Sequence, residues 1–146
     1  SSTCYATGSD ETITANLERI DTPAGYGAIG TAMTESSGIF TFPATGIWSI
    51  FQSITMNGNG GARSWAQCDV QTSVDTGSSF QTPTKTIGSV SAVDYYQTFC
   101  GEYIFDVTNI STHQIKFTVK ASGAMRVFGN TSQTYTYFLF KRLGDT

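Results

Sequence analysis

Apolar and polar residues alternate along much of this chain with a period of two. The clearest run is His113–Ala121, where every second residue from Ile115 onward is apolar and the residues between are Lys or Thr. Arg63–Val74 alternates in a similar way, with Gln67 and Asp69 on its polar side. Because successive side chains of a strand point to opposite faces, this pattern predicts strands with one buried and one solvent-exposed face.

Clusters of Gly, Asn and Ser divide the chain into further runs of strand-forming residues, and no long helical stripe interrupts them. The predicted strands are Thr3–Thr7, Thr12–Ile20, a short segment from Ile39, Gly46–Met56, Arg63–Val74, Phe80–Val93, Tyr95–Val107, His113–Ala121 and Gln133–Leu143. Pro83 favours an edge position for its strand, and Gly101 indicates a bulge or bend. About eight to ten strands with frequent turns predict an all-β fold, a two-sheet antiparallel jelly-roll sandwich occupying residues 1–146 as one domain.

Two of the predicted strands, Gly46–Met56 and Gln133–Leu143, carry large apolar side chains on both faces. A two-layer sandwich covers only one face of each sheet, so the second apolar face requires another cover. A second copy of the same chain supplies that cover in a closed, symmetric assembly. The candidate interface residues are Trp48, Ile50, Phe51, Tyr135, Tyr137 and Leu139.

The composition supports the all-β prediction and restricts the class of partner. Ser and Thr together account for 39 residues, 13% of the residues are aromatic, and only 13% are charged. The net charge is −3 and the eight Lys and Arg residues are scattered, which argues against nucleic-acid binding. No apolar run approaches the roughly 20 residues of a membrane helix, so membrane insertion is not expected.

No motif of catalysis or of cofactor binding stands out. His113 is the only histidine, and there is no G-x-S-x-G nucleophile motif to accompany it, so we do not expect an enzyme. Asp69, Asp75 and Asp94 are far apart in sequence and form no calcium-loop pattern, so no metal site is predicted. No cofactor is expected either.

The three cysteines, Cys4, Cys68 and Cys100, lack C-x-x-C spacing and cannot form a complete set of disulfides. We expect them to be buried free thiols, since free Cys is among the most buried residue types. One disulfide with one remaining thiol is the alternative.

A carbohydrate site is a further possibility, because sugar sites combine exposed aromatic rings with amides and carboxylates. Trp65 shares the polar face of its strand with Gln67 and Asp69, and Asp94 precedes the pair Tyr95-Tyr96. These six residues are the candidate ligand-binding residues. The alternative for Trp65 is that it packs under a loop or against a neighbouring subunit.

The segment Gly38–Trp48, GIFTFPATGIW, resembles the G-x-F-x-x-P-x-x-G-x-Y segment of the complement globular-head and tumour necrosis factor superfamily, with Trp48 in the place of Tyr. Asn109–Val119 is similar to the late turn and strand of that family. Tyr135–Leu143 is similar to its closing F-x-G-x-L strand, with Tyr137 in the place of Gly. The resemblance implies a ten-strand jelly roll that forms trimers, lines the threefold axis with aromatic residues, and binds rather than catalyses.

Two hypotheses for function follow. The first is a homotrimeric structural or attachment head of a virion or of an extracellular surface fibre, which acts by assembly and by binding a receptor or surface. The alternative is a lectin-like or cytokine-like module that recognises carbohydrate or a protein receptor. Both place the domain on a virion surface or outside the cell.

Overall fold

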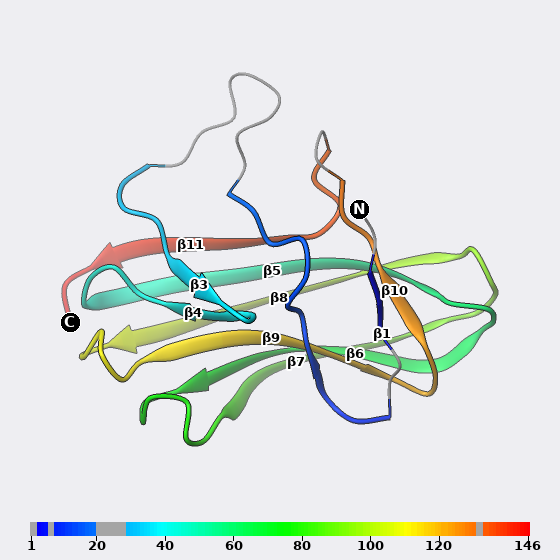
Figure 1. The fold of residues 1–146 in the computed structure, drawn as a ribbon, viewed down its shortest axis with the longest axis horizontal. Coiled ribbons are helices and arrows are strands. Elements are labelled where there is room, and N and C mark those ends of the chain that lie inside the picture. Colours follow the sequence, from blue (N-terminus) through cyan, green and yellow to red (C-terminus); the bar gives the residue numbers. More distant parts are fainter. Residues whose placement is uncertain (1–2, 6–7, 20–28, 131–132) are drawn as a thin grey trace.

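Eleven strands form the framework of the described residues. The computed structural model describes residues 3–5, 8–19, 29–130 and 133–146, and no helix occurs among them (Figure 1). The strands are β1 (Thr3–Tyr5), β2 (Glu11–Thr12), β3 (Thr34–Ser36), β4 (Ile39–Thr41), β5 (Gly46–Gly58), β6 (Arg63–Ser73), β7 (Gln81–Val90), β8 (Tyr96–Val107), β9 (Gln114–Ala121), β10 (Met125–Val127) and β11 (Tyr137–Gly144). They pair antiparallel in two sheets, so the predicted all-β sandwich is confirmed. In this part of the chain no helix long and apolar enough to span a membrane is found.

The long strands lie close to where the alternating pattern predicts them, but the first third of the chain differs. The predicted strand Thr12–Ile20 is wrong, since β2 ends at Thr12 and residues 13–19 form no strand. Asn16 has a φ of 58°, which is incompatible with extended backbone and turns the chain away from the sheet. The short strands β2, β3 and β10 contain too few residues to show alternation.

The first sheet is built around β5. Along one edge, β5 pairs with β8 continuously from Gly46 to Asn57. Along its other edge it pairs with β11 and then with β10, and β1 follows beyond β10. Figure 1 shows β5 running along the length of the molecule between β11 and β8. Every long strand of this sheet therefore takes its position from β5.

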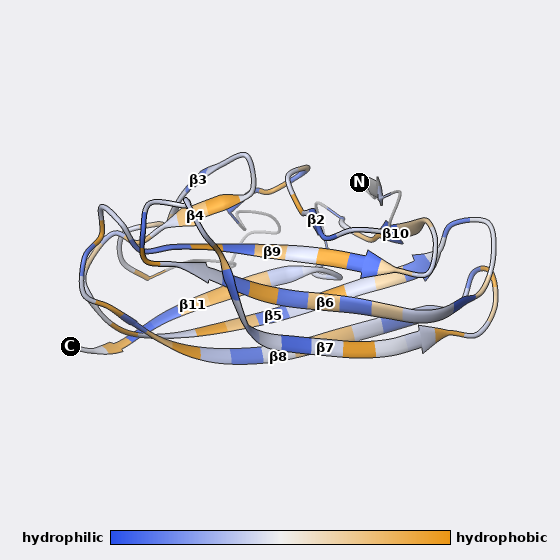
Figure 2. Cartoon of the chain, turned by 90° about the horizontal axis from the view of Figure 1, so that it is seen from below, coloured by the Kyte–Doolittle hydropathy of each residue, from blue (hydrophilic) through white to orange (hydrophobic). Residues whose placement is uncertain are grey.

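The second sheet has the order β3-β4-β9-β6-β7, and β2 also pairs with β9. β7 lies at the end of this order, as Pro83 predicts. Hydrophobic and hydrophilic residues alternate along β6 and β9, and the hydrophobic side faces the first sheet (Figure 2). The solvent-exposed face predicted for β6 is wrong over residues 66–73, where the polar side chains are buried as well.

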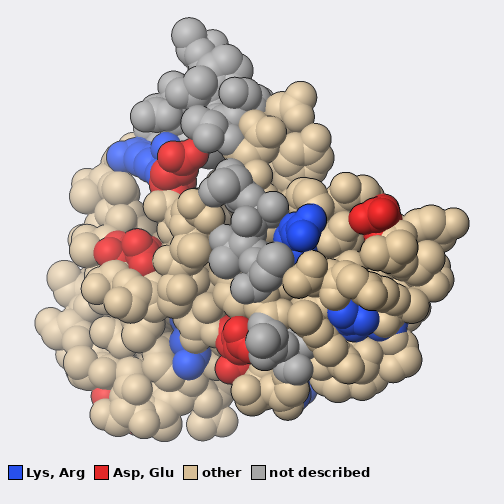
Figure 3. All heavy atoms as spheres, turned by 45° about the vertical axis from the view of Figure 1, so that its right-hand side comes forward, with Lys and Arg blue, Asp and Glu red and all other residues tan. Residues whose placement is uncertain are grey.

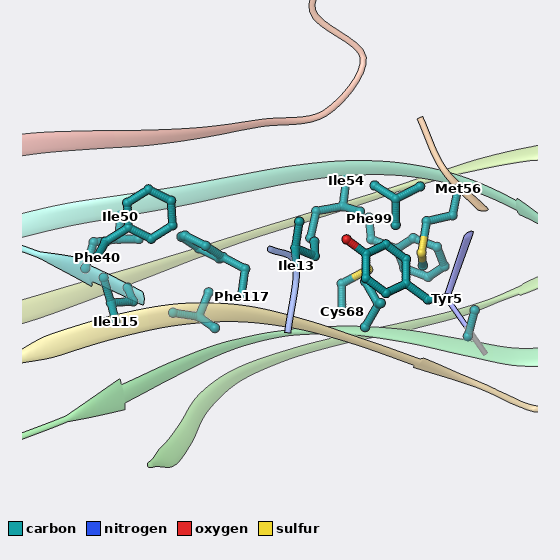
Figure 4. Close-up of a cluster of buried hydrophobic side chains, with 14 of the residues drawn as sticks. Tyr5, Ile13, Phe40, Ile50, Ile54, Met56, Cys68, Phe99, Ile115 and Phe117 are labelled. Carbon is teal, nitrogen blue, oxygen red and sulfur yellow. The ribbon is translucent and has the colours of Figure 1, made fainter. Parts of the chain in front are cut away.

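The core lies between the two sheets and is filled by side chains from both. β5 contributes Ile50, Ile54 and Met56, each 0% exposed. Cys68 of β6 and Phe117 of β9 face them from the second sheet and are equally inaccessible (Figure 4). Burial of this apolar surface is the main force that holds the sheets together.

A cluster of aromatic rings joins the sheets at one place in this core. Phe117 of β9 stacks on Phe138 of β11, with ring centroids 3.7 Å apart. Phe40 of β4 lies against Phe138 and Phe140, with centroid distances of 6.1 and 5.3 Å. Phe138 and Phe140 therefore face the core, and the alternate residues of β11, Tyr137 and Leu139, face outward.

Gln52 of β5 is a polar residue inside this core, and it is 0% exposed. Its Nε2 donates a hydrogen bond to the carbonyl oxygen of Cys68 in the opposite sheet, at 3.2 Å. The Cα partner of Gln52 in β8 is Gly101, where an added Cβ would lie 3.0 Å from a methyl carbon of Thr84. The predicted bulge at Gly101 is therefore wrong. β8 pairs without interruption, and Gly101 provides the space in which β7 approaches β8.

Gly46 is the position at which we expect a substitution to damage the fold most. Its φ is 138°, and an added Cβ would collide with the carbonyl oxygen of Gly144 and lie 2.7 Å from Nε of Arg142. Backbone strain costs about 1–3 kcal/mol and the collision adds to it, so Gly46→Val should lower the free energy of unfolding by about 3 kcal/mol or more. Urea denaturation followed by tryptophan fluorescence measures this change.

Gly60 provides the matched control, because its φ is 83° but no atom lies within 4 Å of the added Cβ. Gly60→Val should therefore show the cost of strain without the cost of collision. If Gly46→Val and Gly60→Val lowered the free energy of unfolding by the same amount, the role assigned to the contact between Gly46 and Gly144 would be contradicted.

Candidate functional site

Large apolar side chains from three strands meet on the outer face of the first sheet. Leu139 of β11 is the Cα partner of Phe51 of β5, and the ring of Tyr137 lies 5.9 Å from that of Phe51. Ile104 of β8 pairs with Ser49, two residues before Phe51. Leu139 is 39% and Ile104 49% exposed. Phe51, Ile104, Tyr137 and Leu139 are called the apolar face below.

Small and neutral side chains surround the apolar face on β5. Ser49 and Ser53 flank Phe51 on the same side of the strand and are 9% and 6% exposed. Glu102, the Cα partner of Phe51, accepts a hydrogen bond from Oγ of Ser49 at 2.7 Å. This surface therefore joins exposed apolar groups to polar groups that already have partners, a combination that favours contact with another protein surface.

Of the six residues predicted for the interface, two belong to the core and are corrected here. Trp48 and Ile50 are 6% and 0% exposed in a single chain, so their side chains are not available to another subunit. They lie on the side of β5 that faces the second sheet, whereas Phe51 lies on the other side. Tyr135 is 43% exposed and precedes β11, and its hydroxyl donates a hydrogen bond to Gln133.

A shallow hollow of about 390 Å³ lies on the outer face of the second sheet. Its lining residues are Asp10, Trp65, Gln67, Lys85, Ile87 and Lys120. Gln67 of β6 lies at its centre, since its Cα partners are Ile87 of β7 and Lys120 of β9. Trp65 is 37% exposed and Ile87 63%. The hollow thus has an apolar side formed by Trp65 and Ile87 and a polar side formed by the other residues.

Asp69 lies two residues beyond Gln67 on the same face of β6 and is 2% exposed. Its Oδ2 accepts a hydrogen bond from Nε2 of Gln67 at 2.6 Å, while its Oδ1 is buried without a partner. Burial raises the pKa of this carboxyl, and the hydrogen bond from Gln67 and the charge of Lys85 offset part of that effect. Asp69 is not among the residues that line the hollow, and its contribution there is the hydrogen bond that orients Gln67.

The predicted ligand residues fall into two separate groups. Trp65, Gln67 and Asp69 lie together on β6. Asp94 and Tyr95 lie in the turn before β8, and Tyr96 begins β8 in the first sheet, with its ring centroid 4.8 Å from that of Phe128. The six residues therefore do not form one site.

The sequence analysis missed four residues of the hollow, Asp10, Lys85, Ile87 and Lys120, and one residue of the apolar face, Ile104. The alternation along β7 shows that Lys85 and Ile87 are exposed on its outer side. Only the register of β7 and β9 with β6 shows that Ile87 and Lys120 lie beside Gln67.

His113 is buried, whereas its position at a turn-to-strand junction predicts exposure. It is 8% exposed, and its ring stacks on Phe105 with a centroid distance of 5.5 Å. Its two ring nitrogens lie 3.0 Å and 3.3 Å from the hydroxyls of Thr112 and Thr108. These contacts give His113 a structural role at the end of β8.

Cys68 and Cys100 are both free thiols, as predicted, but only one is buried. Burial raises the pKa of the Cys68 thiol well above its usual value. Cys100 is exposed on the outer side of β8, so the prediction of burial is wrong for it. Its Sγ lies 3.7 Å from Oγ of Ser53. The side chain of Cys4 lies outside the described residues.

Charged groups are dispersed over the surface. On the face drawn in Figure 3, Lys and Arg residues lie apart from one another and are interspersed with Asp and Glu. Among the described residues, no three His, Cys, Asp or Glu side chains gather in a way that could hold a metal ion.

Comparison with solved structures identifies the type of jelly roll. Eiger, a tumour necrosis factor from S. frugiperda, matches with a TM-score of 0.61 and 10% identity over 78% of this chain and 70% of that one. Murine APRIL matches with a TM-score of 0.57 and 14% identity over 97% and 98% of the two chains. The globular domain of zebrafish complement 1qA matches with a TM-score of 0.50 and 6% identity over 99% and 98%.

The fold is that of tumour necrosis factor-like and complement globular-head domains. The fold implied by the resemblance of Gly38–Trp48 is thereby confirmed. No family model matches the sequence, and no curated protein matches it significantly. At identities of 6–16% the likeness concerns the fold and assigns no function.

Asp75 orders the turn between β6 and β7, and we expect it to make stability depend on pH. Hydrogen bonds from Ser79 and Ser73 lower its pKa from 3.8 to about 2. Because the folded state holds the ionised carboxylate, this stabilisation is complete above pH 4 and is lost as the pH falls from about 4 to 2. Carboxyl-detected NMR titration should give a pKa near 2, and Asp75→Asn should flatten the stability profile in that range. A titration midpoint near 4 would contradict the arrangement.

Proposed function

We propose that this domain is the head of a homotrimer, an attachment head of a virion or of an extracellular surface fibre that acts by assembly and by binding a receptor or surface. The apolar face is the observation that carries the proposal. It places Phe51, Tyr137 and Leu139 side by side on adjacent strands, with Ile104 next to them.

The extent of this face supports assembly. An aromatic side chain buries about 150–250 Å² when it is fully covered, and each Å² of apolar surface removed from water contributes about 25 cal/mol. Four large apolar residues per chain therefore give a favourable term of several kcal/mol before the costs of association. The side chains of β5 between them are serines, which allow two sheets to approach closely.

The number of subunits follows from the resemblance to the tumour necrosis factor and complement-head superfamily, which implies a threefold axis lined by aromatic residues of one sheet. In this chain the aromatic residues that the apolar face offers to such an axis are Phe51 and Tyr137. A closed assembly also agrees with the position of the apolar face on a single sheet, since it covers every copy of the face, whereas an open array leaves the face at its end exposed.

The alternative is a lectin-like or cytokine-like module whose main task is recognition of a ligand. The hollow around Trp65 is the observation that favours it, because it combines an exposed aromatic ring with amide, ammonium and carboxylate groups. Binding at this hollow is compatible with assembly through the other sheet.

Light scattering of the purified domain at micromolar concentration should give a mass close to three times 15.7 kDa. Tyr137→Asp should lower that mass, since it places a charge in the apolar face beside Phe51. Ile110→Asp is the matched control, because Ile110 is 43% exposed in the turn before β9 and its substitution should leave the mass unchanged. A monomeric wild type, or an unchanged mass for Tyr137→Asp, would refute the proposed trimer.

A further inference from the structure

We propose that the hollow on the second sheet binds a pyranose sugar, with the ring stacked on Trp65 and its hydroxyls bound between Lys85 and the side chains of Gln67 and Asp10. The inference deepens the binding function proposed above by naming a ligand class. It does not depend on the trimer, because every group in the hollow belongs to one chain.

The apolar side of the hollow suits the C–H face of a sugar ring. Trp65 precedes Gln67 by two residues on β6, and Ile87 is the Cα partner of Gln67 on β7, so the two side chains lie diagonally on one face. Both are exposed, at 37% and 63%. Small-molecule sites combine such apolar surfaces with a few well-placed polar groups.

The polar side contains hydrogen-bond acceptors that a ligand can reach. The carboxylate of Asp10 and the side-chain amide of Gln67 both line the hollow. A hydroxyl can donate to the carboxylate of Asp10 or to the amide oxygen of Gln67. Asp69 helps to hold the amide of Gln67 in place, because its Oδ2 accepts a hydrogen bond from Nε2 of Gln67 at 2.6 Å.

The rim of the hollow contains ammonium groups that can donate hydrogen bonds to a ligand. Lys85 is the Cα partner of Asp69, and it takes part in none of the ion pairs found among the described residues. Lys120 on the other side has Asp10 as its partner, at 3.6 Å. Ammonium groups only donate hydrogen bonds, and carboxylates only accept them.

A hydroxyl both donates and accepts, so it can accept a hydrogen bond from Lys85 and donate one to Gln67 or Asp10. A phosphate would be repelled by Asp10, and a cation by Lys85 and Lys120. A purely apolar ligand would cover these polar groups without giving them a hydrogen-bond partner. A pyranose, with one apolar face and an edge of hydroxyls, matches both sides.

The test uses the native protein on a glycan array, followed by ligand-observed saturation-transfer NMR with the methyl pyranosides that the array indicates. Sorbitol, an open-chain polyol without a rigid apolar face, is the negative control. We expect saturable binding in the millimolar range that sorbitol does not reproduce, with saturation entering at the C–H face of the ring. Binding should also protect Trp65 from acrylamide quenching, because the other tryptophan, Trp48, is already buried.

Four variants test the assigned roles. Trp65→Ala should abolish binding, and Lys85→Gln, an exposed change that leaves the fold intact, should weaken it about tenfold. Ile87→Ala should weaken binding, whereas Ile110→Ala, the same change at an exposed site in another part of the chain, should not. The mass of every sample is measured by light scattering.

An array without any pyranoside signal, an equal response to sorbitol, or unchanged affinity in Trp65→Ala and Lys85→Gln would overturn the proposal. A trimer that binds no sugar would leave the assembly proposal standing and overturn only this one. A monomer that binds sugar would overturn the assembly proposal and leave the sugar site standing.

Discussion

The rest of the structure depends on the complete pairing of β5. Both of its edges are occupied along almost the whole strand, by β8 on one side and by β11 and β10 on the other. A strand in this position has no freedom of register, because a shift by one residue would exchange the faces of all its side chains. Ile50 and Ile54 would then face solvent and Phe51 the core. The fixed register of β5 thus determines which residues form the core and which form the apolar face.

The aromatic cluster fixes the orientation of β11 in turn. Phe138 stacks on Phe117 of the second sheet, and Phe140 packs against Phe40. Since successive residues of a strand alternate, these contacts direct Tyr137 and Leu139 outward, beside Phe51. The same packing that joins the two sheets therefore creates the apolar face, and weakening the Phe117–Phe138 contact would disturb the assembly surface as well as the core.

The sequence predicts the long strands well because alternation is a local signal. β6, β8 and β9 lie close to their predicted bounds for this reason. It does not predict which face of β5 points inward, since both faces carry large apolar side chains and the choice depends on the sheet that covers them. The hollow is harder still to predict. Lys85 and Ile87 meet Gln67 through a β6–β7 register that contains two irregularities, and no local pattern encodes these.

The two proposed surfaces lie on opposite sides of the sandwich, because each is the outer face of a different sheet. Assembly through the first sheet therefore leaves the hollow on the second sheet of every subunit open. A shallow site that holds a single ring gives only weak affinity, yet several such sites on one rigid head act together on a surface that presents many copies of the ligand. Multivalent binding of this kind can exceed the affinity of one site by about 10²–10⁴ without any new contact. The two proposals therefore fit one arrangement, in which the proposed assembly would supply the strength that the hollow lacks.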